Sequence, residues 1–134
     1  MKEYFNYHKH THYSNIYTVD SNTKIQEYIN RSIELNHTSF STCEHGSMGS
    51  IFEAKMLCEN NNLKCIPVAE YYIVENPFEK DKRNYHIIVA PKTDEARKKV
   101  NYISSLANIE GYYYKPRISP QWLIDNLNPD DIYI

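Results

Sequence analysis

The spacing of apolar and polar residues divides this chain into short strands that alternate with helices. Ile25, Ile29 and Ile33 recur at helical spacing and predict a helix from about residue 23 to residue 35. The same periodicity predicts further helices after residues 50 and 93. Strands are expected where short apolar runs stand between turn residues, over 4–10, 39–42, 65–69, 85–90 and 131–134.

Residues at the expected helix starts support these boundaries. Two pairs match the capping-box pattern, Thr23 with Gln26 and Ser50 with Glu53. Thr93 is expected to cap the third helix, and Ser119 followed by Pro120 is typical of the start of a short last helix. Pro67 lacks a backbone N–H and therefore suggests an edge strand or an irregular ladder over 65–69.

The order of these elements predicts an α/β architecture with mostly parallel strands and outer helices. In such folds, functional side chains collect at the carboxyl ends of the strands. His8 and His10 end the first expected strand, His45 follows the second, and Glu70 follows the third. His86 lies at the start of the fourth strand. The sequence thus predicts one cluster built from several strands.

Size and composition narrow the classes of protein. The chain has 134 residues, of which 41% are hydrophobic, so it suits one domain or part of one. A net charge of −2 argues against nucleic-acid binding by bulk charge. Three glycines and no phosphate-loop motif disfavour a nucleotide-binding fold. Three cysteines without a C-x-x-C pair favour a reducing compartment. The sequence shows neither an apolar run long enough to span a membrane nor a signal peptide. We therefore expect a cytoplasmic location and no membrane partner.

The alternation of His8, His10 and His12 places their side chains on one face of an extended segment. Imidazoles and carboxylates are ligands for zinc, manganese and iron, and mixed sets leave coordination positions open for hydrolysis of phosphate esters. Asp20 is a further candidate ligand, although it could equally begin a turn or cap a helix. A single histidine is more often a surface residue, and His12 is expected to be one.

A segment rich in tyrosine and cations follows the third helix, over residues 112–117. Its rings and charges could stack on nucleic acid or pair with it. The alternative is that the rings pack on the domain while the charges reach solvent, and packing is favoured.

Several motifs resemble the PHP (polymerase and histidinol phosphatase) family. Residues 8–14 are similar to the first motif of that family, and residues 42–48 are similar to its Thr-Asp-His-Gly motif. Residues 64–72 resemble the motif that ends in a glutamate ligand, and residues 85–90 resemble the His-Leu-x-x-Leu-Ala strand. Residues 102–118 resemble the PHP domain of the bacterial replicative DNA polymerase III alpha subunit. Glu44 stands where the family usually has aspartate.

The resemblance implies a distorted seven-stranded β/α barrel with up to three metal ions, Zn²⁺ or Mn²⁺ and also Fe²⁺. It implies metal-ligand roles for six residues: His8, His10, Asp20, His45, Glu70 and His86. Lys115 and Arg117 are candidate nucleic-acid contacts. The implied activity is metal-dependent phosphoester hydrolysis, either 3′–5′ exonuclease proofreading at a DNA primer 3′ end or pyrophosphate removal, in association with a polymerase.

The resemblance implies that a complete PHP barrel carries further ligands in its second half, including a late Asp-x-His pair. No such pair follows His86. Residues 1–134 are therefore expected to form a single partial PHP domain, about the first half of the barrel. Three explanations are open: a truncated or split reading frame, a segment completed by the rest of a polymerase or another chain, or a reduced domain. Two other functions are also open, a non-catalytic structural remnant that supports a polymerase and a free-standing phosphatase.

Overall fold

The computed structural model describes residues 4–17 and 19–134, and it confirms the mixed α/β class. The α-helices among these residues are α1 (Ile25–Glu34), α2 (Ile51–Asn60), α3 (Asp94–Ile109) and α4 (Pro120–Asn126). The strands are β1 (Ser39–His45), β2 (Lys64–Ile73), β3 (Tyr85–Pro91), β4 (Tyr112–Tyr113), β5 (Lys115–Ile118) and β6 (Ile132–Tyr133). Short 3-10 turns span His12–Ile16 and Pro129–Asp131.

The strand β2 is the centre of the sheet. Along one edge it pairs in parallel with β1, so that His45 lies beside Glu70, and further along it pairs in parallel with β5 at Tyr72 and Ile73. Along the other edge β2 pairs antiparallel with β3. The β3–β6 and β4–β5 pairs are also antiparallel, so the sheet is mixed. The antiparallel step from β2 to β3 follows from their connection, which is a loop over 74–84 and not a crossover helix.

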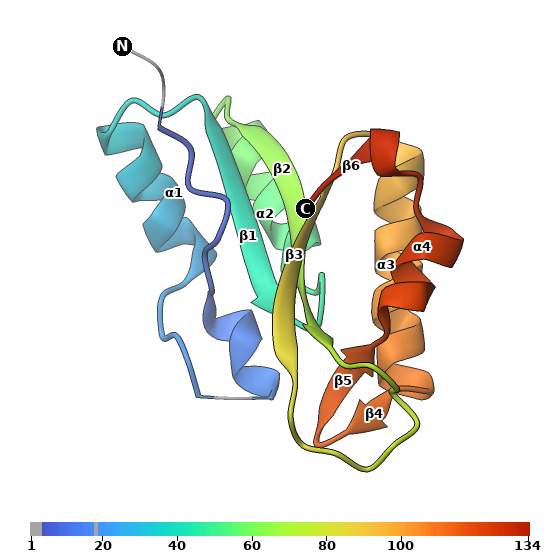
Figure 1. Ribbon diagram of the computed structural model, residues 1–134. Helices are drawn as coiled ribbons and strands as arrows, with labels where there is room; N and C mark the ends of the chain where they lie inside the picture. Colours follow the sequence, from blue (N-terminus) through green and yellow to red (C-terminus); the bar gives the residue numbers. More distant parts are fainter. Residues whose placement is uncertain (1–3, 18) are drawn as a thin grey trace.

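Helices cover the sheet in two groups (Figure 1). One group packs α1 and α2 on β1, with Ile25, Phe40 and Cys58 fully buried between them. The other packs α3 on β2, β3 and β5 around Tyr71, Val89 and related side chains, with α4 packed against α3. Each helix turns an apolar face to the sheet, which is the usual origin of such two-layer packing.

The strand predicted over 4–10 is absent, and this prediction is wrong for the described residues. The segment runs in an extended form beside β1 (Figure 1), but one backbone bond joins it to β1, from Cys43 N–H to the Lys9 carbonyl at 2.8 Å. Side chains still alternate, because Lys9 Nζ lies 4.3 Å above the Phe40 ring while His8 and His10 face Glu70. The shared face of His8 and His10 is therefore retained without a ladder.

Two predicted capping boxes are also wrong. Helix α1 begins at Ile25, and its Glu27 carboxylate accepts the Lys24 N–H at 2.7 Å, one residue beyond the predicted pair. At α2, the Ser50 hydroxyl donates to Thr42 Oγ1 at 2.8 Å, and Glu53 accepts the Tyr13 hydroxyl at 2.8 Å. At α1 the local bond is shifted by one residue, whereas at α2 tertiary partners replace the local bonds that the pattern predicts.

The caps at Thr93 and Ser119 are confirmed. Thr93 Oγ1 accepts the Ala96 N–H at 3.1 Å, and Ser119 Oγ accepts the Trp122 N–H at 3.3 Å with Pro120 in the first turn. Pro67 belongs to a central strand, but to the part of β2 that pairs with β1 alone, since pairing with β3 begins at Ala69. A missing N–H is tolerated there.

The three cysteines, Cys43, Cys58 and Cys65, are free thiols, as the sequence predicts. Across residues 4–17 and 19–134, no helix combines the length and the apolar character needed to cross a membrane.

Candidate metal centre

The candidate site is built around one buried carboxylate on the central strand. Glu70 lies on β2 with its side chain 2% exposed. Its neighbours in sequence, Ala69 and Tyr71, belong to the apolar core under α3, so strand alternation sends Glu70 and Tyr72 to the opposite face. The parallel register with β1 sets His45 beside Glu70. The fold therefore buries a carboxylate at a position that an apolar side chain would ordinarily fill.

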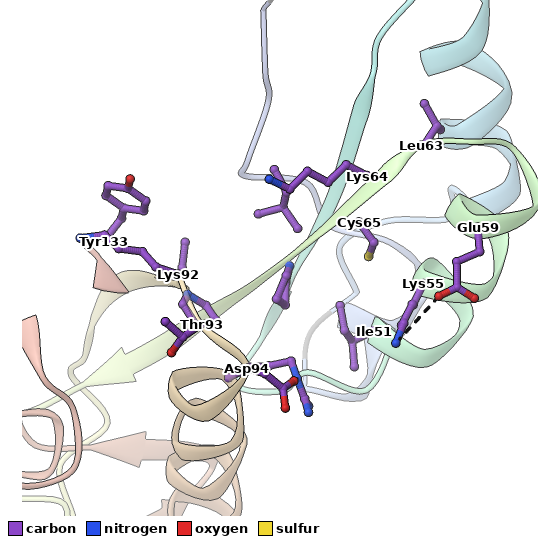
Figure 2. A pocket seen from close by; sticks show the side chains of 15 residues that line it. Ile51, Lys55, Glu59, Leu63, Lys64, Cys65, Lys92, Thr93, Asp94 and Tyr133 are labelled. Atoms are coloured by element: carbon purple, nitrogen blue, oxygen red, sulfur yellow. Dashed lines mark hydrogen bonds and ion pairs between the residues drawn. The ribbon is translucent and has the colours of Figure 1, made fainter. Parts of the chain in front are cut away.

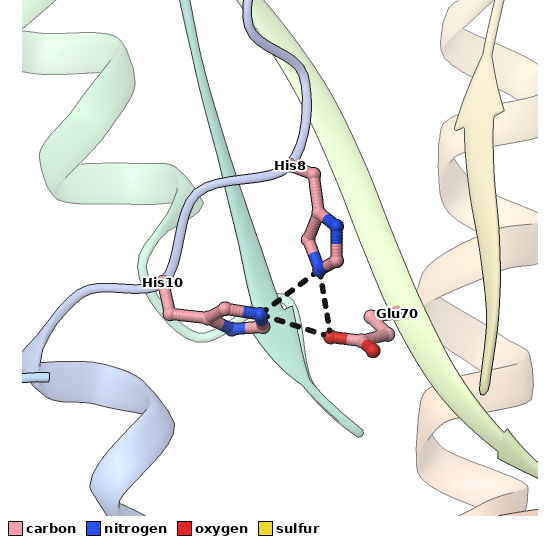
Figure 3. A group of neighbouring side chains, drawn as sticks. All are labelled: His8, His10 and Glu70. Atoms are coloured by element: carbon pink, nitrogen blue, oxygen red, sulfur yellow. Dashed lines mark hydrogen bonds and ion pairs between the residues drawn. The ribbon is translucent and has the colours of Figure 1, made fainter. Parts of the chain in front are cut away.

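Four imidazoles surround this carboxylate. Glu70 Oε2 lies 3.5 Å from His8 Nε2, 3.2 Å from His10 Nε2 and 3.1 Å from His45 Nδ1. The other oxygen, Oε1, lies 2.6 Å from His86 Nδ1 on β3. Figure 3 shows that His8 and His10 reach Glu70 from the N-terminal segment. Three separate parts of the chain thus converge on one carboxylate.

Asp20 adds a second carboxylate from the loop before α1. Its Oδ2 lies 3.3 Å from His45 Nε2 and 3.7 Å from His10 Nδ1. The loop is held by Asn15, whose Oδ1 accepts the backbone N–H groups of Asp20 and Ser21. His45 therefore has one ring nitrogen beside each carboxylate, and Asp20 completes a second set of potential ligands with His10 and His45.

Ring stacking fixes the orientations of these side chains. The His10 ring stacks on His45 with centroids 4.1 Å apart, and His45 in turn stacks on Tyr72 at 5.6 Å. His86 meets the edges of both His45 and Tyr72. Rings packed in this way lose little additional entropy when they bind an ion, which is a form of preorganisation.

The site contains buried polar atoms that lack hydrogen bonds. Among the described residues, His45 Nδ1, Glu70 Oε2 and the Tyr72 hydroxyl are buried without a hydrogen-bond partner. The ring nitrogens near Glu70 Oε2 are close to it but are not aligned to donate to it. Buried polar atoms are rarely left unpaired, because each one costs about 1–3 kcal/mol. Nitrogen and carboxylate lone pairs directed at a common space fit a divalent metal ion.

Electrostatics favour the ligating forms of several of these groups. Burial acts to raise the pKa of Glu70, but His45 and the other imidazoles outweigh it and hold this pKa at about 2. Burial, followed by the proximity of His45, lowers the pKa of His10. Burial also acts to lower the pKa of His45, yet Glu70 raises it overall. An ionised glutamate and a neutral His10 are the forms that bind metals.

The structure brings all six predicted ligand residues together: His8, His10, Asp20, His45, Glu70 and His86. His12 is exposed and begins the 3-10 turn that follows, away from the cluster. A metal-ligand role for the six remains a prediction. Their convergence is nevertheless what a shared metal centre requires.

Lys115 and Arg117 occupy different environments. Lys115 Nζ lies 4.3 Å above the Tyr72 ring, at the edge of the candidate site. Arg117 is 2% exposed, and its guanidinium donates to four backbone carbonyls. These carbonyls belong to Pro77, Glu79, Asp81 and Gly111. The prediction that Arg117 contacts nucleic acid is therefore corrected, because three of these four acceptors belong to the 74–84 loop, which the buried guanidinium holds in place.

The sequence leaves two alternatives for the tyrosines at 112–114, packing on the domain or contact with nucleic acid, and the three rings differ in their exposure. Tyr112 and Tyr114 are 54% and 61% exposed, and Tyr114 carries Lys82 Nζ 3.9 Å above its ring. Tyr113 is half-buried and faces Arg117 at 5.2 Å. Tyr113 therefore packs on the domain as predicted, whereas the rings of Tyr112 and Tyr114 are largely exposed to solvent.

A cavity of about 570 Å³ lies elsewhere in the molecule (Figure 2). It is lined by α2, the start of β2, the end of β3 and the start of α3. Two ion pairs of its lining lie along single helices, Lys55 with Glu59 and Arg97 with Asp94. Among the described residues, the lining of this cavity holds no converging group of three His, Cys, Asp or Glu side chains, so the candidate chemistry is at Glu70.

Sequence reasoning missed three residues of the site: Ser14, Glu44 and Tyr72. Ser14 donates to Glu44 and also contacts His10 Nδ1 and the His45 N–H, whereas Tyr72 packs against His45 and His86. The signal that could have found Tyr72 is strand alternation, because Tyr72 is two residues after Glu70 and must share its face.

A mixed sheet flanked by helices, with histidines and carboxylates gathered beside its central strand, defines an α/β domain with a candidate metal centre. Comparison with known proteins then gives the family: the PHP domain model matches residues 6–131, and the chain belongs to that family.

Its relatives include DNA polymerase III subunit alpha of Treponema pallidum, which is 30% identical over 122 residues, and that of Helicobacter pylori, which is 31% identical over 125 residues. These alignments cover 87% and 91% of this chain but 10% of each relative. The chain thus spans about a tenth of the length of the curated relatives that it matches.

Two solved structures share the fold. A protein assigned as a metal-dependent phosphoesterase, from Bifidobacterium adolescentis, aligns with a TM-score of 0.57 and 14% identity, covering 80% of this chain and 34% of that one. An amidohydrolase from Chromobacterium violaceum, solved with bound sulfate and no metal, aligns with a TM-score of 0.54 and 16% identity, covering 76% and 32%. At these identities the likeness supports the fold prediction and not a shared activity.

Proposed function

We propose that this chain is part of a PHP domain of the DNA polymerase III alpha type, and that it binds divalent metal for phosphoester hydrolysis. The observation that carries the proposal is the buried Glu70 carboxylate, which four imidazoles face and whose Oε2 lacks a hydrogen bond. Without an ion, this arrangement buries a charge and several unpaired atoms at a considerable cost.

The donors divide into sets that suit Zn²⁺ or Mn²⁺, and Fe²⁺ as well. His8, His10 and Glu70 form one set, and His45 with Glu70 and His86 forms another, so that Glu70 belongs to both. Asp20 adds a carboxylate on the far side of His45. A bound ion would supply Lewis acidity toward a phosphoryl oxygen and lower the pKa of a coordinated water.

Two neighbouring residues are suited to binding the phosphate. Lys115 places an ammonium group over Tyr72, and cations of this kind neutralise phosphate oxygens. The Tyr72 hydroxyl is buried without a partner, and burial raises its pKa to about 12, so it keeps its proton. We assign it as a hydrogen-bond donor to a bound phosphoryl oxygen, with Lys115 as the nearby charge.

The homology to a polymerase subunit supports a place in DNA replication in the cytoplasm. The proposed substrate is the 3′ end of a DNA primer, presented through a polymerase, or pyrophosphate released by it. The structural neighbours are about three times as long as the part that aligns, so we propose that residues 1–134 form one portion of a barrel. The remainder of the polymerase, or a complementing chain, would supply further ligands.

The test is substitution of ligand residues on either side of Glu70. His10→Ala and His45→Ala should each weaken Mn²⁺ and Zn²⁺ binding by ten- to a hundredfold in titration calorimetry. Both should also lower metal-dependent release of nucleotides from a primer 3′ end when the chain is assembled with its polymerase. His37→Ala is the matched control, since His37 lies outside the cluster. Unchanged activity in both variants would overturn the catalytic proposal.

A non-catalytic structural role is a second candidate. It is favoured by the coverage of the structural neighbours, because this chain aligns with 34% of the first of them. This role predicts stoichiometric metal binding and a metal-dependent rise in Tm without nucleotide release. A free-standing phosphatase would instead hydrolyse phosphate monoesters in the absence of DNA and of a polymerase.

A further inference from the structure

A second buried carboxylate, Glu44, lies directly behind the candidate site. Glu44 is 1% exposed and comes from the end of β1, one residue before His45. Its Oε1 accepts the Thr11 hydroxyl at 2.6 Å, and its Oε2 accepts the Thr11 N–H at 3.1 Å and the Ser14 hydroxyl at 2.5 Å. Its hydrogen bonds go to Thr11 and Ser14 and not to the six candidate ligands, but Ser14 links it to two of them, His10 and His45.

The positions of the protons follow from these contacts. The Thr11 hydroxyl oxygen accepts the Tyr13 N–H at 3.2 Å, so its own proton is directed to Glu44. A hydroxyl group has a single proton, and Ser14 directs that proton to Glu44 Oε2. Ser14 Oγ can therefore act toward its other neighbours as an acceptor only. These neighbours are His10 Nδ1 at 3.1 Å and the backbone N–H of His45 at 3.3 Å.

We infer that Glu44 and Ser14 are positioning residues that fix the tautomer of His10. The proton of the neutral ring is held on Nδ1, which donates to Ser14, and the lone pair is left on Nε2. Nε2 lies 3.2 Å from Glu70 Oε2 and 3.0 Å from His8 Nε2. A carboxylate that orients a metal-binding imidazole through its second nitrogen is a general device of metal sites. The inference rests on the proposed metal binding at His10.

The relay also selects between the potential ion positions. His10 could in principle ligate through Nδ1 beside Asp20, or through Nε2 beside Glu70. With Nδ1 protonated and donating to Ser14, only Nε2 can ligate. His10 therefore binds with His8 and Glu70, and Asp20 serves the His45 side of the cluster.

The experiment compares Ser14→Ala and Glu44→Gln with Tyr13→Phe. Tyr13 lies next to Ser14, and its hydroxyl donates to Glu53 at 2.8 Å outside the relay, so Tyr13→Phe removes a hydrogen bond without touching His10. Titration with MnCl₂ should give a Kd raised ten- to a hundredfold in Ser14→Ala and unchanged in Tyr13→Phe. Glu44→Gln should also raise the Kd for Mn²⁺.

A second readout separates positioning from mere structural support. Long-range ¹H–¹⁵N spectra of the metal-free chain should show His10 as the Nδ1–H tautomer in the wild type, and as a mixture in Ser14→Ala. An Nε2–H tautomer in the wild type, or a wild-type Mn²⁺ Kd in a folded Ser14→Ala, would overturn the relay. A wild type that binds no Mn²⁺ would overturn the proposed function instead, and the tautomer measurement would still test the relay.

Discussion

Glu44 and Glu70 are two buried carboxylates on neighbouring strands, and their surroundings are opposite in kind. Glu44 accepts three hydrogen bonds, all from Thr11 and Ser14. Glu70 faces four ring nitrogens from three parts of the chain, and its Oε2 has no aligned donor. A fully bonded carboxylate stabilises the fold around it, whereas a carboxylate oxygen without a donor among ring nitrogens is the arrangement expected of a metal ligand. Satisfaction of the buried atoms, more than burial itself, separates a structural role from a functional one.

The largest effect on stability is expected for Glu44→Ala. The substitution leaves the Thr11 N–H and two hydroxyl groups buried without an acceptor, so the free energy of unfolding should fall by about 3–5 kcal/mol. Urea unfolding followed by circular dichroism measures this fall. Glu53→Ala is the control, because it loses only the bond from Tyr13 at a half-buried site, and about 1 kcal/mol is expected. Equal decreases in the free energy of unfolding in Glu44→Ala and Glu53→Ala would contradict the prediction that Glu44 is the more important of the two for stability.

Glu70→Gln should have the converse profile. The amide keeps the shape of the side chain but removes the negative charge that two ligand sets share, so Mn²⁺ affinity should fall about a hundredfold, or ~2.7 kcal/mol. The metal-free chain should keep its stability within about 1 kcal/mol, because the substitution also removes the cost of burying a charge. Calorimetric titration and urea unfolding of the same preparation test both statements. Wild-type affinity in Glu70→Gln would show that Glu70 is not a ligand.

Arg117→Met tests a third buried charge, which is structural like Glu44 but faces carbonyl groups. Loss of the guanidinium leaves the carbonyls of Pro77, Glu79 and Asp81 without their donor, so the free energy of unfolding should fall by about 2–3 kcal/mol. Amide hydrogen exchange across 75–83 should increase while Mn²⁺ affinity stays unchanged. A selective loss of DNA binding with intact stability would restore the role in nucleic-acid contact that the sequence predicts for this residue.

The sequence predicts well wherever local chemistry decides. Thr93 and Ser119 cap their helices as expected, since the bonds span three residues. It fails where distant partners compete: Ser50 bonds to Thr42 in preference to its own helix. The segment 4–10 has strand-like residues, but a strand needs a ladder, and β1 offers it a single backbone bond.

The candidate site divides in the same way. Residue types and expected strand ends select His45 and Glu70, which the parallel register of β1 and β2 places side by side. His8, His10 and Asp20 join the same cluster from segments outside the strands. The burial of Arg117 could not be predicted, since it depends on a loop that closes around it from some 40 residues away. Which ring nitrogen of His10 faces which partner is likewise a tertiary fact, set by Ser14 and Glu44.

The smallest expected effect belongs to His12, and it separates sequence pattern from structure most cleanly. His8, His10 and His12 are equivalent in an alternating pattern, yet the chain turns into a 3-10 turn at His12 and carries that ring to the exposed surface. His8→Ala should therefore weaken Mn²⁺ binding about tenfold, since His8 Nε2 lies 3.5 Å from Glu70 Oε2. His12→Ala should leave both the Mn²⁺ Kd and the stability within about 0.5 kcal/mol of the wild type. If calorimetry instead gave equal losses for the two variants, the extended pattern would persist through residue 12 in solution, and the turn that removes His12 from the site would be wrong.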